Sequence, residues 1–333
     1  MDNPISNDAE KVLKVLKSKK GRFVSIREIA KSSGLSRFNL YQSIHKLQEW
    51  AYDIESQKGK GYRLNKITDF LLPIEIKNIL KTNVLGKEIH SYHTVKSTNL
   101  LAYKLAETGS PEGALVLSEK QTAGKGRMGR SWFSPAKSGL WMSLILKPHI
   151  PPSKMPGLSI CAGLALAQTV QKLFGLEAKL KWPNDCLIGQ RKFAGILVEL
   201  SAEMDQVRFA IMGIGININQ KRVDFPGDLK KKATSISIEL GEKVLRLELL
   251  KHFLERFEKI YLGFAKKGLG AYRSEIKKHS LLLNQEVKIK LGDKSVVGTA
   301  VDIDHNGSLV IKTKTGTETV TAGEVFLLQS RKD

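Results

Sequence analysis

Residues 181–199, KWPNDCLIGQRKFAGILVE, predict a hairpin in the central sheet of the protein. Residues 177–180 and Cys186–Ile188 have strand-like patterns, and the Pro-Asn-Asp sequence at 183–185 is typical of a turn. The chain then re-enters the sheet at 191–199, which places Lys192 near the start of a strand. A lysine taken alone is more often a solvated surface residue than a catalytic one, so its neighbours decide its role.

A glycine-rich loop follows an apolar strand predicted at 114–117. It reads GKGRMG at 124–129 and matches the letters of the dinucleotide fingerprint G-x-G-x-x-G. That fingerprint requires a helix that begins within the glycines, and the following residues 131–135, SWFSP, cannot form a long helix. We therefore exclude dinucleotide binding. Two interpretations remain: a phosphate-binding loop with Lys125, Arg127 and Arg130 as its cations, or a basic flexible surface loop.

Two further segments carry polar or glycine residues at informative places. Ser97, Thr98 and Asn99 lie between a strand predicted at 89–92 and an amphipathic helix, so they either cap the helix or hold a polar ligand group. Gly213 and Gly215 fall at the end of an apolar strand that begins at residue 209. Because glycine weakens a strand, we expect another group to approach the backbone closely there.

The first 65 residues predict a winged helix-turn-helix. Helices are expected from about Glu10 and from Ser25, while Gly34 can end the second helix with a positive φ and Ser36 can cap the third. Short strands are expected at 52–55 and 62–64 around a basic hairpin tip, KGKG. A recognition helix followed by a basic hairpin favours DNA binding over the alternative, a small helical protein-interaction module. The candidate DNA contacts are Ser36, Arg37, Asn39, Tyr41, Gln42, Lys46, Lys58 and Lys60, with Ser43 and His45 on the same helix face.

Composition narrows the class of protein without naming a partner. The chain of 333 residues has 54 Lys+Arg and 33 Asp+Glu, a net charge of +21 that is spread along its whole length. The two cysteines form no CxxC pair, which favours a reduced, cytoplasmic compartment. The N-terminus is too polar for a signal peptide, and the longest apolar run, 157–167, is too short to cross a bilayer. The seven histidines form no convincing metal set, so metal ligands stay unknown.

Five motifs, in this order and at this spacing, resemble the biotin protein ligases: STN at 97–99, GKGRMG at 124–129, KWPND at 181–185, RKFAGILVE at 191–199 and GIGIN at 213–217. Together with the winged helix-turn-helix, the chain resembles the bifunctional members that are both ligase and biotin operon repressor. The resemblance implies an α+β multidomain fold. It comprises a winged helix-turn-helix at 1–65, a mixed β-sheet ligase core flanked by helices (class II synthetase-like) at 66–275, and an SH3-like β-barrel at 276–333. Short strands around turns between 287 and 325 independently predict a small barrel.

The resemblance also implies a site. The implied catalytic residues are Lys192, Arg127 and Asp185. The biotin-binding residues would be Ser97, Thr98, Asn99, Gln121, Lys125, Gly126, Arg127, Lys192 and Gly195. The adenylate-binding residues would be Gly124, Gly126, Gly129, Trp132, Asn184 and Asn217. Two loop positions depart from the family pattern: Lys125 stands where Arg is usual, which removes a bidentate fork, and Met128 stands where some members carry another cation.

The family reaction uses biotin and ATP as substrates, with Mg²⁺ on the phosphates, to form biotinyl-5′-AMP. Biotin then passes to a lysine of a biotin carboxyl carrier protein. By the same resemblance, the intermediate acts as co-repressor, and a liganded homodimer binds operator DNA. The alternatives are a metabolite-sensing repressor without catalysis and a lipoate or octanoate transferase of related fold. The presence of the lysine and the glycine loop argues against the first alternative, and the winged helix argues against the second.

Overall fold

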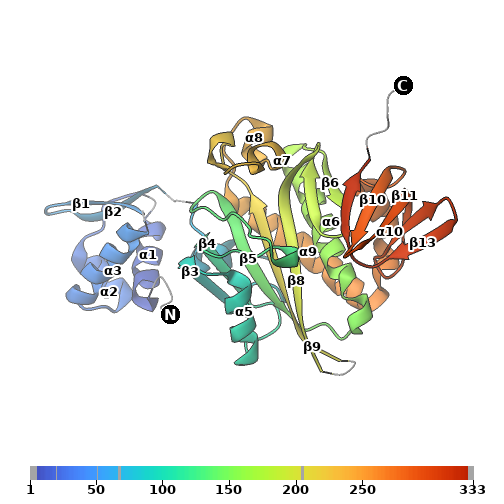
Figure 1. Ribbon diagram of the computed structural model, residues 1–333. Coiled ribbons are helices and arrows are strands. Elements are labelled where there is room, and N and C mark those ends of the chain that lie inside the picture. The colour runs from blue at the N-terminus through green and yellow to red at the C-terminus, as the bar shows by residue number, and fades with distance from the viewer. Residues whose placement is uncertain (1–5, 20, 51, 67–68, 204–205, 329–333) are drawn as a thin grey trace.

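The computed structural model describes residues 6–19, 21–50, 52–66, 69–203 and 206–328. Figure 1 shows three parts in chain order. A small helical unit with a long hairpin lies at one end, a large sheet with helices occupies the middle, and short antiparallel strands lie at the other end.

The N-terminal unit is the predicted winged helix-turn-helix. Its elements are α1 (Asn7–Ser18), α2 (Ile26–Ser33), α3 (Arg37–Glu49), β1 (Asp53–Gln57) and β2 (Gly61–Lys66). Gly34 ends α2 at a φ of 71°, and the Ser36 hydroxyl accepts a hydrogen bond from the amide of Asn39 at 3.2 Å, both as predicted. Helix α1 begins three residues earlier than expected because the Ser6 hydroxyl caps it.

One residue of the predicted polar face lies elsewhere. Ser43 is buried, because positions 40, 43, 44 and 47 follow the i, i+3, i+4, i+7 spacing of the inward stripe of α3.

The N-terminal unit packs on the central part through aromatic residues. Trp50, which follows α3, is buried, and its ring stacks on the His93 ring with 3.5 Å between centroids. Phe70 packs edge-on against the same indole. The apolar cluster of this unit continues through Phe70 and Leu72 to Ile74, beyond the boundary proposed at residue 65. Pro73 is the first residue of α4 (Pro73–Ile79), a position that suits proline because the first helical amide needs no partner.

The central part is a seven-stranded mixed sheet in the order β3-β4-β5-β9-β8-β7-β6. The strands are β3 (Ile89–Val95), β4 (Leu115–Gln121), β5 (Gly139–Leu146), β6 (Ala178–Lys181), β7 (Asp185–Ile188), β8 (Arg191–Glu203) and β9 (Gln206–Asn217). Only the β3–β4 pair is parallel among the ladders of the described residues. Residues 185–195 form the β7–β8 hairpin, as predicted.

Helices cover both faces of this sheet because its strands alternate two apolar sets. Leu115, Leu117 and Met212 point to the cluster formed with α6 (Pro156–Phe174) and α9 (Arg246–Lys267). Val116 and Ile211 point to the opposite face, which α5 (Thr98–Glu107) covers. The short helices α7 (Leu229–Lys232) and α8 (Ile236–Leu240) follow β9 and lie at one end of the sheet (Figure 1).

The C-terminal part is a five-stranded antiparallel sheet in the order β13-β12-β11-β10-β14. Its strands are β10 (Glu286–Leu291), β11 (Lys294–Ile303), β12 (Leu309–Thr313), β13 (Gly316–Val320) and β14 (Glu324–Leu327), preceded by α10 (Arg273–His279). The ladders of the described residues leave β13 and β14 as the outer strands. The Trp182 indole donates to the carbonyl of Gly307 at 2.8 Å and so joins this part to the β6–β7 turn.

A buried ion cluster fixes the segment that connects the first two parts. Arg246, at the start of α9, is only 2% exposed and forms ion pairs with Glu119 of β4 at 2.7 Å and with Asp69 at 3.1 Å. The Glu119 carboxylate also accepts the amide of Leu71 at 3.3 Å. The connecting segment is therefore anchored to the strand that ends at Gln121.

Candidate functional site

A cavity of about 300 Å³ lies where the glycine loop passes over the ends of the central strands. Its walls come from α5, the loop at 125–133, the β6–β7 turn, β8, β9 and residues 323–325 of the C-terminal part. The predicted ligase-site residues on its surface are Ser97, Thr98, Asn99, Gln121, Lys125, Gly126, Arg127, Trp132, Asn184, Asp185, Lys192, Gly195 and Asn217. Gly124 and Gly129 belong to the same loop but do not line the cavity, so the structure does not bring them to it.

Polar side chains form the floor of the cavity near the start of α5. Gln121 Oε1 accepts from the amide of Thr98 at 2.8 Å and from its hydroxyl at 3.1 Å. Ser97 is the residue before α5, but its side chain makes no capping hydrogen bond, and that leaves its hydroxyl available to a ligand. Ser97 is therefore not a side-chain cap of α5, and its contact with a ligand stays a prediction.

The two strand glycines meet side chains at van der Waals distance, as the sequence predicted. A methyl carbon added at Gly213 would lie 2.8 Å from Cγ of Asn99. One added at Gly215 would lie 2.5 Å from Cε2 of Trp132. Only glycine therefore lets these two side chains lie flat against β9.

The glycine loop is a tight hairpin without the helix that a dinucleotide fingerprint needs. The amide of Gly126 donates to the carbonyl of Arg130 at 2.7 Å, and the amide of Trp132 donates to the carbonyl of Gly124 at 2.8 Å. Only a 3₁₀ turn, Arg127–Gly129, occurs between them, with Met128 at a φ of 57°. The exclusion of dinucleotide binding made from the sequence is consistent with this backbone.

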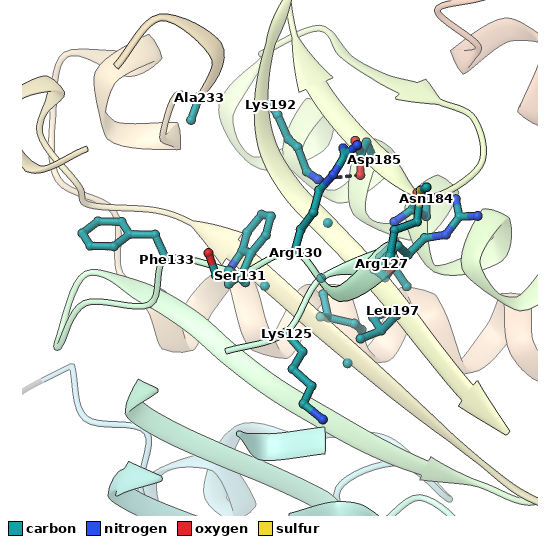
Figure 2. Close-up of a pocket in the computed structure, with 18 of the residues that line it drawn as sticks. Lys125, Arg127, Arg130, Ser131, Phe133, Asn184, Asp185, Lys192, Leu197 and Ala233 are labelled. Atoms are coloured by element: carbon teal, nitrogen blue, oxygen red, sulfur yellow. Dashed lines mark hydrogen bonds and ion pairs between the residues drawn. The ribbon is translucent and has the colours of Figure 1, made fainter. Parts of the chain in front are cut away.

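Lys192 is held in the cavity by an anion and an aromatic ring. Its Nζ lies 2.7 Å from Oδ1 of Asp185 (Figure 2). It also lies 5.0 Å from the ring centroid of Trp132. The buried indole N–H of Trp132 has no hydrogen-bond partner within the described residues. Burial lowers the pKa of the nearby Lys181, with Asp185 opposing the shift and Lys192 adding to it.

Arg127 reaches the same wall from the glycine loop. Its guanidinium donates to Oδ1 of Asn184 at 3.1 Å, and Asn184 Nδ2 donates in turn to the carbonyl of Ile196 at 2.8 Å. Burial lowers the pKa of Arg127, and the Asp185 carboxylate opposes that shift. Because Arg127 and Lys192 both lie near Asp185, this end of the cavity is suitable for an anionic ligand.

The other two loop cations are placed differently. Lys125 is exposed and extends away from the Lys192–Asp185 pair in Figure 2. Arg130 pairs with Glu324 of β14 at 2.6 Å, a contact between distant parts of the chain that sequence reasoning missed. No local signal could have indicated it, because an Arg in a loop and a Glu at the start of a strand are common in any sequence.

The predicted DNA contacts form a second surface, on the N-terminal unit. These residues lie at the N-cap of α3, on α3 and at the hairpin tip, and all are exposed: Ser36, Arg37, Asn39, Tyr41, Gln42, Lys46, Lys58 and Lys60. The rings of Tyr41 and Tyr62 meet edge-on with 6.5 Å between centroids, so the helix and the hairpin support one another. Phe38, which sequence reasoning passed over, is 69% exposed on the same helix.

The histidines and acidic residues that the structure describes form no metal centre. These residues contain no group of three or more His, Cys, Asp or Glu that could hold a metal ion. His90 instead bonds to Glu88 at 2.7 Å and His93 stacks on Trp50. No described helix is both long enough and apolar enough to span a bilayer.

Three family models match the chain in the order of its parts. They are an HTH domain at residues 9–63, the Biotin/lipoate A/B protein ligase family at 91–217, and the Biotin protein ligase C terminal domain at 282–328. The fold and the site thus define the class of protein as a biotin or lipoate type of ligase that carries a helix-turn-helix.

Matches to individual proteins identify the family within this class. The chain is 38% identical over 305 residues to the Bifunctional ligase/repressor BirA of Bacillus subtilis (strain 168), a match that covers 92% of this chain and 94% of that protein. It is 30% identical over 315 residues to the protein of the same name from Escherichia coli (strain K12), at 94% and 95% coverage. The solved biotin protein ligase from Aquifex aeolicus in complex with biotin and ATP matches with a TM-score of 0.64 and 30% identity, over 73% of this chain and 100% of that one. The chain belongs to the family of bifunctional biotin ligase/repressors.

Proposed function

We propose that this protein is an ATP-dependent biotin protein ligase and a transcriptional repressor. It joins biotin to AMP as biotinyl-5′-AMP, transfers the biotinyl group to a lysine of a biotin carboxyl carrier protein, and represses biotin synthesis genes with the intermediate as co-repressor. The observation that carries the enzymatic part is the Lys192–Asp185 pair in one cavity with the polar floor and the glycine loop.

The first step brings a carboxylate to the α-phosphate of ATP and releases pyrophosphate. Two unit charges about 4 Å apart repel by roughly 4 kcal/mol at an effective dielectric near 20. Lys192 and Arg127 are fixed cations that offset this repulsion and stabilise the charge that develops on the phosphate. The ion pair with Asp185 keeps Lys192 in place until the ligand carboxylate accepts from its ammonium.

We assign the remaining roles by position in the cavity. The floor, with Ser97, Thr98, Asn99 and Gln121, binds the ring system of biotin. Trp132, Asn184 and Asn217 bind the adenylate, and the backbone of 124–129 closes over the phosphates. Lys125 is exposed, so its positive charge contributes to ligand binding only after the loop has closed. Closure also shields the mixed anhydride from water.

Biotin-dependent exchange of pyrophosphate into ATP tests the enzymatic proposal. We expect Lys192→Ala to lower the exchange rate by about a thousandfold, as expected for loss of a group that stabilises the transition state. The matched control is Lys172→Ala, which removes an exposed lysine of α6 and leaves exchange unchanged. Full exchange by a folded Lys192→Ala protein would remove Lys192 from the mechanism. Absence of exchange in the unaltered protein would favour the metabolite-sensing repressor, and octanoyl transfer would favour the transferase.

The repressor proposal predicts that DNA binding depends on the intermediate. With duplexes selected from a random pool by the liganded protein, affinity measured by fluorescence anisotropy rises when biotinyl-5′-AMP is added. Replacing Lys58 and Lys60 together by Ala makes the negative slope of log K against log salt less steep by about 3.6 for the homodimer. The two winged helices then lose four lysines, and each phosphate that a lysine no longer neutralises accounts for about 0.9. Equal affinity with and without biotinyl-5′-AMP would contradict the co-repressor role.

Three further assignments complete the proposal. Mg²⁺ arrives on the phosphates of ATP as part of the substrate. The liganded protein is a homodimer, so that two winged helices meet a two-fold operator. The location is cytoplasmic, which the two buried free thiols, Cys161 and Cys186, support.

A further inference from the structure

A continuous chain of hydrogen bonds runs behind the floor of the cavity. The Asn99 amide donates through Nδ2 to Oε2 of Glu199 on β8 at 2.6 Å. Its Oδ1 accepts from the hydroxyl of Ser143 on β5, also at 2.6 Å. Ser143 Oγ lies 2.8 Å from Oγ1 of Thr98, which donates to Oε1 of Gln121. Neither Glu199 nor Ser143 lines the cavity.

The carboxylate at one end gives this chain a fixed direction. An ionised carboxylate only accepts hydrogen bonds, so the Asn99 amide must turn its NH₂ to Glu199 and its oxygen to Ser143. The Ser143 hydroxyl then has to give its one hydrogen mainly to Asn99. Thr98 gives its own hydroxyl hydrogen to Gln121 and keeps lone pairs for the cavity.

Burial makes this direction difficult to reverse. Ser143 is 0% exposed, and Thr98 and Asn99 are also buried, so water cannot take over an unsatisfied donor or acceptor. Ser143 is also a polar residue in an otherwise apolar strand, GLWMSLIL, although the sequence alone did not connect it to the site.

We propose that Glu199 and Ser143 are positioning residues that make the cavity floor a hydrogen-bond acceptor for the ring N–H groups of biotin. The inference rests on the proposed function and deepens it, because a cyclic urea offers two N–H donors that need such acceptors. Without the anion, the Asn99 amide can turn over and donate to Ser143. The Ser143 hydrogen then goes to Thr98 and occupies a lone pair that the ligand requires.

The test measures biotin binding separately from chemistry in the full chain. We expect Glu199→Ala to raise the biotin KM about tenfold, or about 1.4 kcal/mol, as for a ligand N–H that loses one hydrogen-bond acceptor. Glu199→Gln, which can still bond to Asn99 in one of two amide orientations, gives a smaller rise. Ser143→Ala gives a smaller rise than Glu199→Ala, because no hydroxyl is left to donate to Thr98 and only the Asn99 oxygen loses its partner. The ATP KM and the kcat of pyrophosphate exchange stay unchanged in all three variants.

Two comparisons separate positioning from a general loss of structure. Desthiobiotin keeps the cyclic urea, so its Kd by calorimetry rises by the same factor as that of biotin. Glu177→Gln alters an exposed glutamate, 77% exposed, and leaves both ligands unaffected. An unchanged biotin KM in Glu199→Ala would overturn the inference, as would equal rises in the biotin and ATP KM values together with a lower melting temperature. An unaltered protein without exchange would instead refute the proposed function.

Discussion

Replacing Gly215 by Ala tests whether Trp132 has to lie flat on β9. The added carbon would stand 2.5 Å from Cε2 of the indole, whereas carbon atoms pack at about 3.5 Å or more. The ring must therefore move by about 1 Å, and because Lys192 lies over it, the lysine moves as well.

The size of the effect follows from that displacement. A misplacement of about 1 Å at a reacting centre can lower a rate roughly a hundredfold. Overpacking of a buried site also costs about 1 to 3 kcal/mol of stability, which a protein of this size can tolerate and remain folded. We therefore expect Gly215→Ala to be a folded protein whose pyrophosphate exchange is about a hundredfold slower.

The assay pairs exchange kinetics with thermal unfolding and a matched glycine. Gly270→Ala is the control, because no atom lies within 4 Å of the added carbon and the backbone there is compatible with alanine. The control should retain full exchange. A Gly215→Ala protein with unaltered exchange would refute the argument, because the indole would then not need its observed position.

Two other predictions concern the ion clusters. Arg246→Met leaves the buried Glu119 without its cation, so we expect the free energy of unfolding in urea to fall by about 3 to 5 kcal/mol, and adding Glu119→Gln to recover much of it. Partial burial raises the pKa of Asp302, but hydrogen bonds from Lys277 and Arg273 hold that pKa below its ordinary value. The ionised carboxylate therefore contributes to the stability of the fold above about pH 4, and this contribution is lost as the pH falls further. Asp302→Asn should thus lower the melting temperature at pH 7 and lower it less at about pH 2.

Local signals in the sequence were sufficient for the end of α2 and the start of α3. Gly34 and Ser36 act through their own backbone and side chain, so their roles could be read from two residues. Gly213 and Gly215 indicated a close approach but not its source, because Asn99 and Trp132 come from remote segments.

Interactions between distant segments could not be predicted. The Arg246 cluster, the Arg130–Glu324 pair and the Glu199–Asn99 bond each join charged or polar groups whose partners depend on the completed fold. The resemblance to a family named residues that, apart from Gly124 and Gly129, line one cavity, but it did not give their mutual contacts. For Ser43 a local signal was misleading: its polarity suggested exposure, but its position on α3 places it in the interior.

The pairing of Arg130 with Glu324 has a consequence for the timing of synthesis. The glycine loop leaves the ribosome well before the strand that completes the wall of its cavity, with roughly 200 residues between them. At about 5 to 20 residues per second, that interval is roughly 10 to 40 seconds. Once Lys192 has been made, the nascent chain has the lysine and the polar floor but still lacks one wall of the cavity. The complete cavity, and with it full ligand binding, therefore forms only after Glu324 has been synthesised.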